Sequence, residues 1–230
     1  MSDLRIALIS EGPTDEIIIK AALKAILPRP FILTPLQPER TRPDLGVGWG
    51  GVLKWCREFH SRGFTTFEAD PTLELFDLFV LHLDADVAGY SYADLGRPLE
   101  EAAQQEDWGL LPGSKDCPPP DTTINDLKPV LLSWLGISAI GDRTILCIPS
   151  KTIEPWLAAA LYPNNNNLLN NLECVNMATR LAQLPKGQRI KKRVRDYQAY
   201  EATVKVMWAG IRQKCTRADI FHTEVEGAIL

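Results

Sequence analysis

Four short apolar runs occur in the first two thirds of the chain, and each is followed by a turn or by a helical pattern. The runs cover residues 5–10, 31–36, 75–83 and 144–150. Short runs of this kind, rich in branched and aromatic residues and bounded by Gly or Pro, predict buried β-strands. Pro35 lies inside the second run and cannot donate to a ladder, so we expect that strand at an edge of the sheet or ending in a loop.

Helical spacing of apolar residues alternates with these runs. The predicted helices begin at Pro13 or Thr14, at about residue 51, at about residue 98, at residue 124 with Thr122 or Thr123 as its cap, and just beyond the fourth run. A proline-rich stretch, residues 106–123, is expected to be a surface insertion. Repeated strand, helix, strand order predicts an α/β fold with a mainly parallel, Rossmann-like four-stranded sheet flanked by helices.

The chain changes character after Pro163, where the tract NNNNLLNN predicts a linker or long loop. The remaining residues are mostly helical in pattern. We therefore expect two domains, an α/β domain over residues 1–162 and a helical, basic extension over residues 163–230 that packs on it.

Charge is distributed unevenly along the chain. The formal net charge is -4, yet residues 180–217 hold eleven Lys or Arg against two acidic residues. This segment is either a solvated helical face or a surface that contacts phosphates. On the second interpretation Lys191, Lys192 and Arg193 are the candidates for nucleic-acid contacts, with Lys192 the first choice.

Several protein classes are disfavoured by composition. The five cysteines are scattered without a CxxC pair, so we expect reduced thiols and neither a disulfide framework nor a thiolate zinc site. His82 lies within an apolar run, where a core or supporting role is expected. No apolar run approaches the roughly 18 residues of a membrane span, and no signal-peptide pattern opens the chain. A cytoplasmic protein without a membrane partner is expected.

Acidic residues follow three of the predicted strands. Glu11 follows the first, Asp84 and Asp86 follow the third, and Glu154 comes shortly after the fourth. Alternate residues of an extended segment point the same way, so Asp84 and Asp86 should project together. Because the carboxyl ends of parallel strands share one edge, these carboxylates should converge there. Such hard oxygen ligands favour Mg²⁺ or Mn²⁺, and four carboxylates are enough for two ions.

Each of these residues also has a structural interpretation. Asp is common where a strand turns, and Glu154 or Asp15 could simply complement a helix dipole. The combination is more specific than its parts. It consists of an apolar strand ending in EG (Glu11, Gly12), an intervening strand and helix, and an apolar strand ending in DADVAG.

This combination resembles the TOPRIM domain of topoisomerases, bacterial primases and OLD-type nucleases. The stretch EGPTDE resembles OLD-type and standalone TOPRIM proteins, and its second acidic residue is Asp15. The stretch IPSKTIEPWLAAAL resembles a segment of the same proteins that contains a glutamate, which corresponds to Glu154 here. The resemblance covers about residues 4–162. It implies that Glu11, Asp84 and Asp86 are catalytic, and that these three together with Asp15 and Glu154 bind divalent metal.

The function implied is metal-dependent cleavage of nucleic acid, DNA more than RNA, in defence against foreign DNA. OLD-type nucleases carry an ATPase, but no GxxxxGK[ST] pattern occurs here, so a separate ATPase partner is expected. Self-association is left open. The main alternative is a noncatalytic TOPRIM-like subunit that binds nucleic acid or protein. An aspartyl-nucleophile phosphatase is less well supported, since DxD here follows the third strand, and a glycosyltransferase would leave the Glu11-Gly12 turn unexplained.

Overall fold

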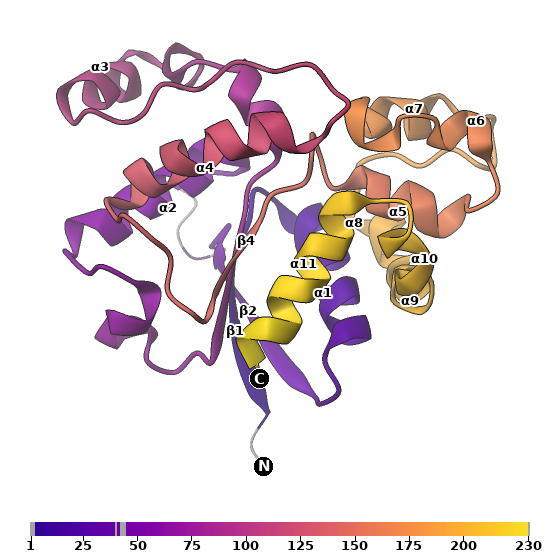
Figure 1. The fold of residues 1–230 in the computed structure, drawn as a ribbon, viewed down its shortest axis with the longest axis horizontal. Helices are drawn as coiled ribbons and strands as arrows, with labels where there is room; N and C mark the ends of the chain where they lie inside the picture. Colours follow the sequence, from indigo (N-terminus) through magenta and orange to yellow (C-terminus); the bar gives the residue numbers. More distant parts are fainter. Residues whose placement is uncertain (1–2, 40, 42–44, 230) are drawn as a thin grey trace.

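The computed structural model describes residues 3–39, 41 and 45–229. Four strands form one all-parallel sheet in the order β2-β1-β3-β4 (Figure 1). Their bounds are β1 Leu4–Ile9, β2 Phe31–Gln37, β3 Leu78–His82 and β4 Thr144–Cys147. The predicted fold class, a parallel four-stranded α/β sheet flanked by helices with a helical C-terminal region, is confirmed.

Strand β1 illustrates how the sheet is buried on both faces away from β2, whose residues are mostly half-buried. Its residues alternate between two apolar cores: Ile6 and Leu8 belong to one, Ala7 and Ile9 to the other, and all four side chains are inaccessible to solvent. Strand β2 is an edge strand, as Pro35 predicts, and the register of its pairing with β1 shifts just beyond Pro35.

Two helical layers cover the sheet (Figure 1). One layer is built on α2 (Gly48–Ser61) and α4 (Asp121–Leu135), with α3 (Arg97–Gln105) beyond them. The opposite layer is built on α1 (Pro13–Ile26), α5 (Glu154–Leu161) and the C-terminal helices. These are α6 Asn166–Leu169, α7 Met177–Gln183, α8 Val194–Gln198, α9 Glu201–Val206, α10 Trp208–Arg212 and α11 Thr216–Ile229. Short 3-10 helices are η1 Phe67–Ala69, η2 Pro71–Leu73, η3 Ala85–Gly89, η4 Tyr92–Leu95 and η5 Leu172–Cys174.

The C-terminal region shares a core with the N-terminal part of the chain. Trp156 of α5 packs against Trp208 and Phe221 with ring centroids 5.3 and 5.6 Å apart, and all three are buried with α1 in one apolar cluster. The asparagine tract is not a continuous loop, because part of it forms α6.

Two predicted boundaries are wrong for identifiable reasons. The third strand starts at Leu78 rather than Leu75, because a turn from η2 precedes it, in which the Phe76 amide donates to the Leu73 carbonyl. Leu75 is therefore 63% exposed. Helix α4 begins at Asp121 rather than Ile124, with Pro120 at its N-cap position, so Thr122 and Thr123 lie inside its first turn and do not cap it. The Thr123 hydroxyl instead accepts a hydrogen bond from the Lys115 amide.

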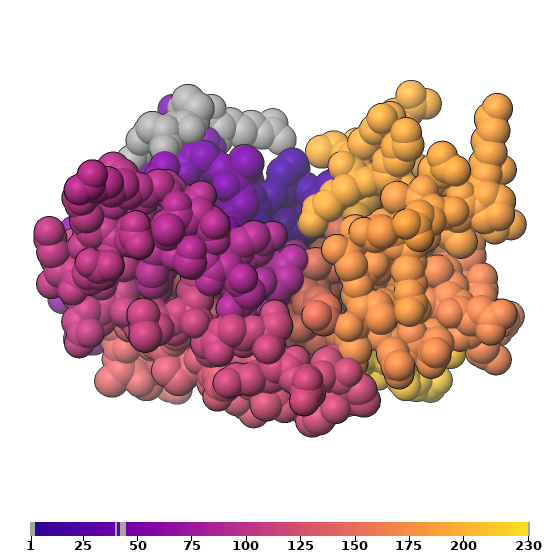
Figure 2. Space-filling view, turned by 90° about the horizontal axis from the view of Figure 1, so that it is seen from above, coloured from indigo at the N-terminus to yellow at the C-terminus, as the bar shows by residue number. Residues whose placement is uncertain are grey.

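The connections define where a ligand site belongs. Helix α1 links β1 to β2 over one face, whereas α2 links β2 to β3 over the other. The order of the strands thus reverses between β1 and β3, and the crevice beyond their carboxyl ends is the usual place for ligands in such sheets. In the view onto this end, purple to magenta residues from the middle of the chain lie on one side of the indigo N-terminal residues, and orange C-terminal residues lie on the other (Figure 2). None of the described helices is long and apolar enough to cross a membrane.

Candidate metal and active site

Glu11 lies at the crevice between β1 and β3. Its Oε1 accepts a hydrogen bond of 2.7 Å from the backbone amide of Asp84, the residue two positions beyond β3. Its own backbone is also fixed, because the Glu11 carbonyl accepts from the Gly48 amide at 2.7 Å and the Ser10 amide donates to the Gln37 carbonyl at 2.8 Å. The structure therefore brings the EG and DADVAG motifs into direct contact.

Asp84 and Asp86 are positioned by a tight turn. Extended geometry ends at Asp84 and η3 begins at Ala85, so the strand alternation expected of the pair does not apply. The turn is tied to the segment after β4, since the Asp86 amide donates to the Lys151 carbonyl at 3.0 Å. Asp84 is 4% exposed and Asp86 is half-buried.

Asp15 and Glu154 complete the acidic cluster from the first turns of two helices. Both are buried, at 1% and 0% exposure. The ammonium of Lys192 lies between them, with Nζ 3.1 Å from Glu154 Oε1 and 3.9 Å from Asp15 Oδ1. The hydroxyl of buried Tyr197 donates to the same Glu154 oxygen at 2.8 Å. A segment distant in sequence thus supplies the cation of the cluster.

His82 is a buried neighbour of Asp84. It is the last residue of β3 and is inaccessible to solvent. Its Nε2 lies 3.2 Å from Asp84 Oδ1 without forming a hydrogen bond. This supporting position agrees with the role expected for a histidine inside an apolar strand.

The electrostatics of the cluster are those of crowded, poorly compensated carboxylates. Burial raises the pKa of Glu11, and repulsion from Asp84 raises it further. The pKa of Asp84 is raised by burial and then by Asp15 and Glu154, and burial likewise raises the pKa values of Asp15 and Asp86. One lysine does not neutralise this group.

Glu154 is the exception. Burial acts to raise its pKa, but Lys192 and the hydrogen bond from Tyr197 outweigh burial and hold the pKa below its usual range. In turn, these carboxylates raise the pKa of Lys192 despite its partial burial. Glu154 and Lys192 are therefore a charged pair inside the acidic cluster.

A divalent cation fits this donor set. Asp84 Oδ1 and Glu154 Oε2 are buried and have no hydrogen-bond partner, so each has an oxygen available to a ligand. Carboxylate oxygens are the ligands that Mg²⁺ and Mn²⁺ prefer. In the described part of the chain, no three acidic, His or Cys side chains are already arranged around one point as a metal centre.

The other two predicted nucleic-acid residues lie apart from the cluster. Lys191 and Arg193 are exposed, and no contact joins either side chain to the acidic residues among the described residues. Tyr197 is a site residue that the sequence alone does not assign to the acidic cluster. No local pattern links it to Glu154, because the two belong to different segments.

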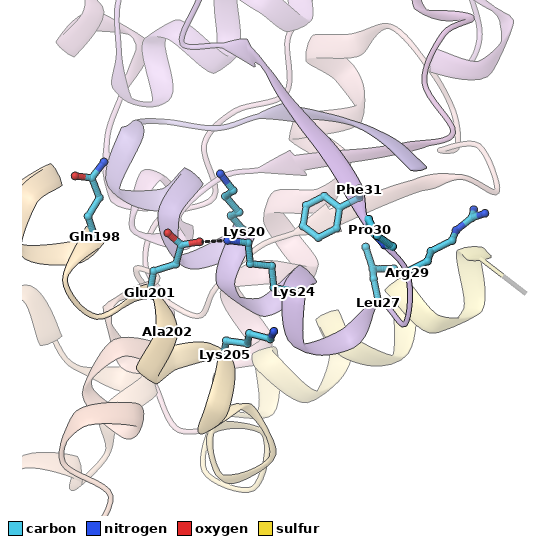
Figure 3. Close-up of a pocket in the computed structure, with 10 residues that line it drawn as sticks. All are labelled: Lys20, Lys24, Leu27, Arg29, Pro30, Phe31, Gln198, Glu201, Ala202 and Lys205. Atoms are coloured by element: carbon cyan, nitrogen blue, oxygen red, sulfur yellow. Dashed lines mark hydrogen bonds and ion pairs between the residues drawn. The ribbon is translucent and has the colours of Figure 1, made fainter. Parts of the chain in front are cut away.

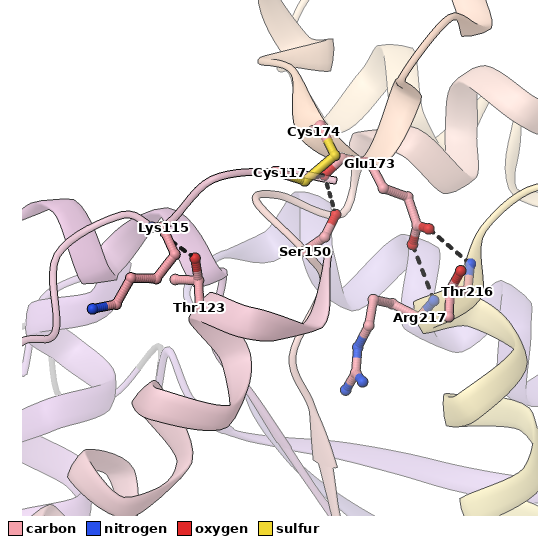
Figure 4. Close-up of a disulfide and its surroundings, with 8 residues drawn as sticks. All are labelled: Lys115, Cys117, Thr123, Ser150, Glu173, Cys174, Thr216 and Arg217. Carbon is pink, nitrogen blue, oxygen red and sulfur yellow. Dashed lines mark hydrogen bonds between the residues drawn. A yellow bond between two sulfur atoms is a disulfide. The ribbon is translucent and has the colours of Figure 1, made fainter. Parts of the chain in front are cut away.

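The proline-rich insertion reaches the edge of the site. Asp86 and Lys151 line a small hollow together with Ser114 and Lys115 of the insertion. A disulfide joins Cys117 to Cys174, with Cα atoms 5.3 Å apart (Figure 4). The expectation that all five thiols are reduced is wrong for this pair, because the fold brings together residues that are 57 positions apart.

The same corner holds the start of α11. The Glu173 carboxylate accepts from the Thr216 and Arg217 amides at 2.8 and 3.0 Å, and the Ser150 hydroxyl donates to the Glu173 carbonyl (Figure 4). Arg217 in turn donates to the Ile148 carbonyl just beyond β4 at 2.9 Å. The insertion, the end of β4 and α11 are therefore mutually fixed beside the site.

Comparison with protein-family models, with curated proteins and with solved structures gives no match to this chain. The resemblance to the TOPRIM domain therefore stays a prediction based on the motif residues.

Proposed function

We propose that this chain is a Mg²⁺- or Mn²⁺-dependent nuclease of the TOPRIM type that hydrolyses phosphodiester bonds of nucleic acid. The observation that carries the proposal is the 2.7 Å hydrogen bond between the Asp84 amide and Glu11. It places the two motifs side by side at the strand-order reversal of the sheet, within a cluster that is rich in carboxylates and poor in cations.

Each residue has a distinct role in this proposal. Glu11, Asp84 and Asp86 hold the metal, one ion or two, with Asp15 and Glu154 as further ligands. The chemistry supplied by the bound metal is polarisation of a phosphoryl oxygen and activation of water. In the metal-free protein burial raises the pKa of the Glu11 carboxyl, so binding of a cation there favours loss of its proton. Lys192 presents an ammonium to a phosphate oxygen.

The substrate, partner and location follow as parts of the same proposal. DNA is the preferred substrate over RNA, and the setting is defence against foreign DNA in the cytoplasm. An ATPase acts as a separate partner, since the sequence has no GxxxxGK[ST] pattern. Lys191 and Arg193 are exposed beside Lys192 and are suited to contact the phosphate backbone outside the acidic cluster.

One observation favours a second candidate, a noncatalytic nucleic-acid or protein-binding subunit. The Lys192 ammonium already pairs with Glu154 and approaches Asp15, and it therefore occupies a position where a metal ion would bind these two carboxylates. In a metal-silent protein this lysine would be a permanent substitute for the ion. The two candidates differ in whether the protein binds divalent metal and whether that metal supports cleavage of nucleic acid.

The experiment compares purified wild type with Asp84→Asn/Asp86→Asn on supercoiled plasmid, linear DNA and single-stranded RNA, with Mg²⁺, Mn²⁺ or EDTA. We expect cleavage by the wild type that needs metal and is lost in the double variant. Glu16→Gln is the matched control, because Glu16 lies next to Asp15 in α1 but outside the cluster.

Two outcomes would contradict the nuclease. The first is no cleavage in any metal, with or without an added ATPase partner, and the second is equal cleavage by the double variant. Calorimetric titration of Mn²⁺ separates the second candidate, since a metal-silent subunit would bind no Mn²⁺ in either protein.

A further inference from the structure

A charged cavity lies at the opposite end of α1 from the acidic cluster. It has a volume of about 670 Å³ and is formed by the C-terminal half of α1, the start of β2 and helix α9 (Figure 3). Because β2 begins there, the cavity is at the amino end of the strands, whereas the acidic cluster is at their carboxyl ends. The two sites are therefore separate.

The lining of this cavity is basic. Four cationic side chains line it, Lys20 and Lys24 of α1, Arg29, and Lys205 of α9, against one carboxylate, Glu201. Lys24 is paired with Glu201 at 2.7 Å. The other three side chains have no hydrogen bond or ion pair within the described part of the chain. In a protein of net charge -4, such a cluster of unpaired cations favours an anionic ligand.

An apolar wall faces these cations. Leu27, Pro30 and Phe31 form it, and the ring of Phe31 points towards the lysines of α1 while Arg29 turns away at the rim (Figure 3). Phe31 is half-buried, so one part of the ring packs on the core and another lines the cavity. A planar ligand group can stack on such a ring.

The two walls together define the ligand chemistry. Cations suit phosphate groups, the aromatic ring suits a nucleobase, and the volume falls in the usual range of small-ligand sites, about 300–1,000 Å³. Inorganic phosphate alone would leave the apolar wall unused, and an apolar ligand would leave the lysines unpaired.

We propose that this cavity binds a nucleotide, with its phosphates at Lys20 and Lys205 and its base on Phe31. The nucleotide is either free or one unit of a nucleic-acid strand. The proposal does not rest on nuclease activity, since it concerns different residues at the other end of the sheet.

The test measures equilibrium binding in EDTA, so that cleavage plays no part. ATP and pyrophosphate are titrated by calorimetry, and a labelled single-stranded oligonucleotide and poly-glutamate by fluorescence anisotropy. The variant is Lys20→Glu/Lys205→Glu. Its control is Lys186→Glu/Lys214→Glu, which makes the same charge change at exposed positions outside the cavity.

We expect the cavity variant to weaken binding of ATP, the oligonucleotide or both by about tenfold or more, and the control to change it much less. If the cavity variant loses affinity for ATP, the ligand is a free nucleotide. If it loses affinity for the oligonucleotide alone, the ligand is a nucleic-acid strand. Phe31→Leu, which keeps an apolar side chain, should weaken binding of the nucleotide ligand but not binding of pyrophosphate.

Three results overturn the proposal. They are no binding of ATP or oligonucleotide by the wild type, equal losses in the cavity and control variants, and binding of poly-glutamate in place of both nucleotide ligands. Thermal melting of each variant establishes that it is folded before binding is compared.

Discussion

Lys192 Nζ lies 3.1 Å from Glu154 Oε1, which joins the basic C-terminal segment to the carboxyl end of the sheet. This contact gives one lysine of the basic segment a role inside the acidic cluster, in addition to the phosphate contacts proposed for the segment. Its central lysine compensates charge within the acidic cluster, even though 45% of the side chain is exposed. Lysine and divalent metal are then competitors for the same carboxylates.

Replacing Lys192 by Met should make stability dependent on metal. Without the ammonium, Glu154 and Asp15 lose their nearest cation, and we expect a loss of about 1–2 kcal/mol in EDTA, less than for a fully buried pair because Lys192 is partly exposed. Mn²⁺ should restore most of this loss by binding only the folded state. Thermal melts with EDTA and with Mn²⁺ measure both effects.

Lys191→Met is the matched control, since Lys191 is an adjacent, exposed lysine without a contact to the cluster. Equal melting temperatures for the two variants in EDTA would show that Lys192 does not compensate these carboxylates.

The cluster should also give the metal-free protein an unusual pH dependence. The pKa values of Glu11, Asp15, Asp84 and Asp86 are all raised in the folded state, chiefly by burial. The folded state then binds more protons than the unfolded state above about pH 4, so these groups stabilise the protein below that pH and lose this contribution as the pH rises through the folded values. Glu154, with its lowered pKa, contributes in the opposite sense and only on acidification below that range.

Asp84→Asn tests this prediction directly. The amide cannot ionise, so in EDTA the variant should be more stable than wild type by about 1 kcal/mol at neutral pH, with the difference shrinking towards pH 4. Urea unfolding across this pH range measures it, and Glu16→Gln should keep the wild-type dependence. If the stabilities of wild type and Asp84→Asn depend on pH in the same way, the pKa of Asp84 is not raised by burial and by the neighbouring carboxylates.

The fold was predictable because its signals are local. Apolar runs bounded by Gly and Pro located all four strands, and Pro35 identified the edge strand without any knowledge of its neighbours. The errors occurred where tertiary contacts decide the outcome. Helix α4 begins at Asp121 and includes Thr123, whose hydroxyl accepts from the Lys115 amide, and the turn after η2 keeps Leu75 out of β3.

The candidate site was predictable only in part, for the same reason. Glu11, Asp84 and Glu154 follow strands, so the topology of a parallel sheet is enough to bring them to one edge. Tyr197 and Cys174 reach that edge through packing of the C-terminal helices on α1 and α5, which no spacing in the sequence encodes.

Tyr197→Phe should reveal how strongly Glu154 is held. The hydroxyl donates to Glu154 Oε1 at 2.8 Å in a buried setting, and hydrogen bonds to charged groups contribute about 1.5–3 kcal/mol. We expect a loss of that size in urea unfolding, together with a higher Glu154 pKa. Tyr200→Phe is the control, because the Tyr200 hydroxyl has no hydrogen bond among the described residues. Equal stabilities for the two variants would contradict a hydrogen bond that matters energetically.

The disulfide gives the last prediction. Cys117 and Cys174 are 57 positions apart, so the bond restricts a long loop in the unfolded chain and should stabilise the protein by about 2–4 kcal/mol. Cys117→Ser/Cys174→Ser should lose this stability in chemical denaturation, and dithiothreitol should lower the midpoint of wild type but not of the variant. Alkylation of the unreduced, denatured wild type should modify three of the five cysteines, Cys56, Cys147 and Cys215. Modification of all five would show that the insertion is held beside Asp86 by packing alone.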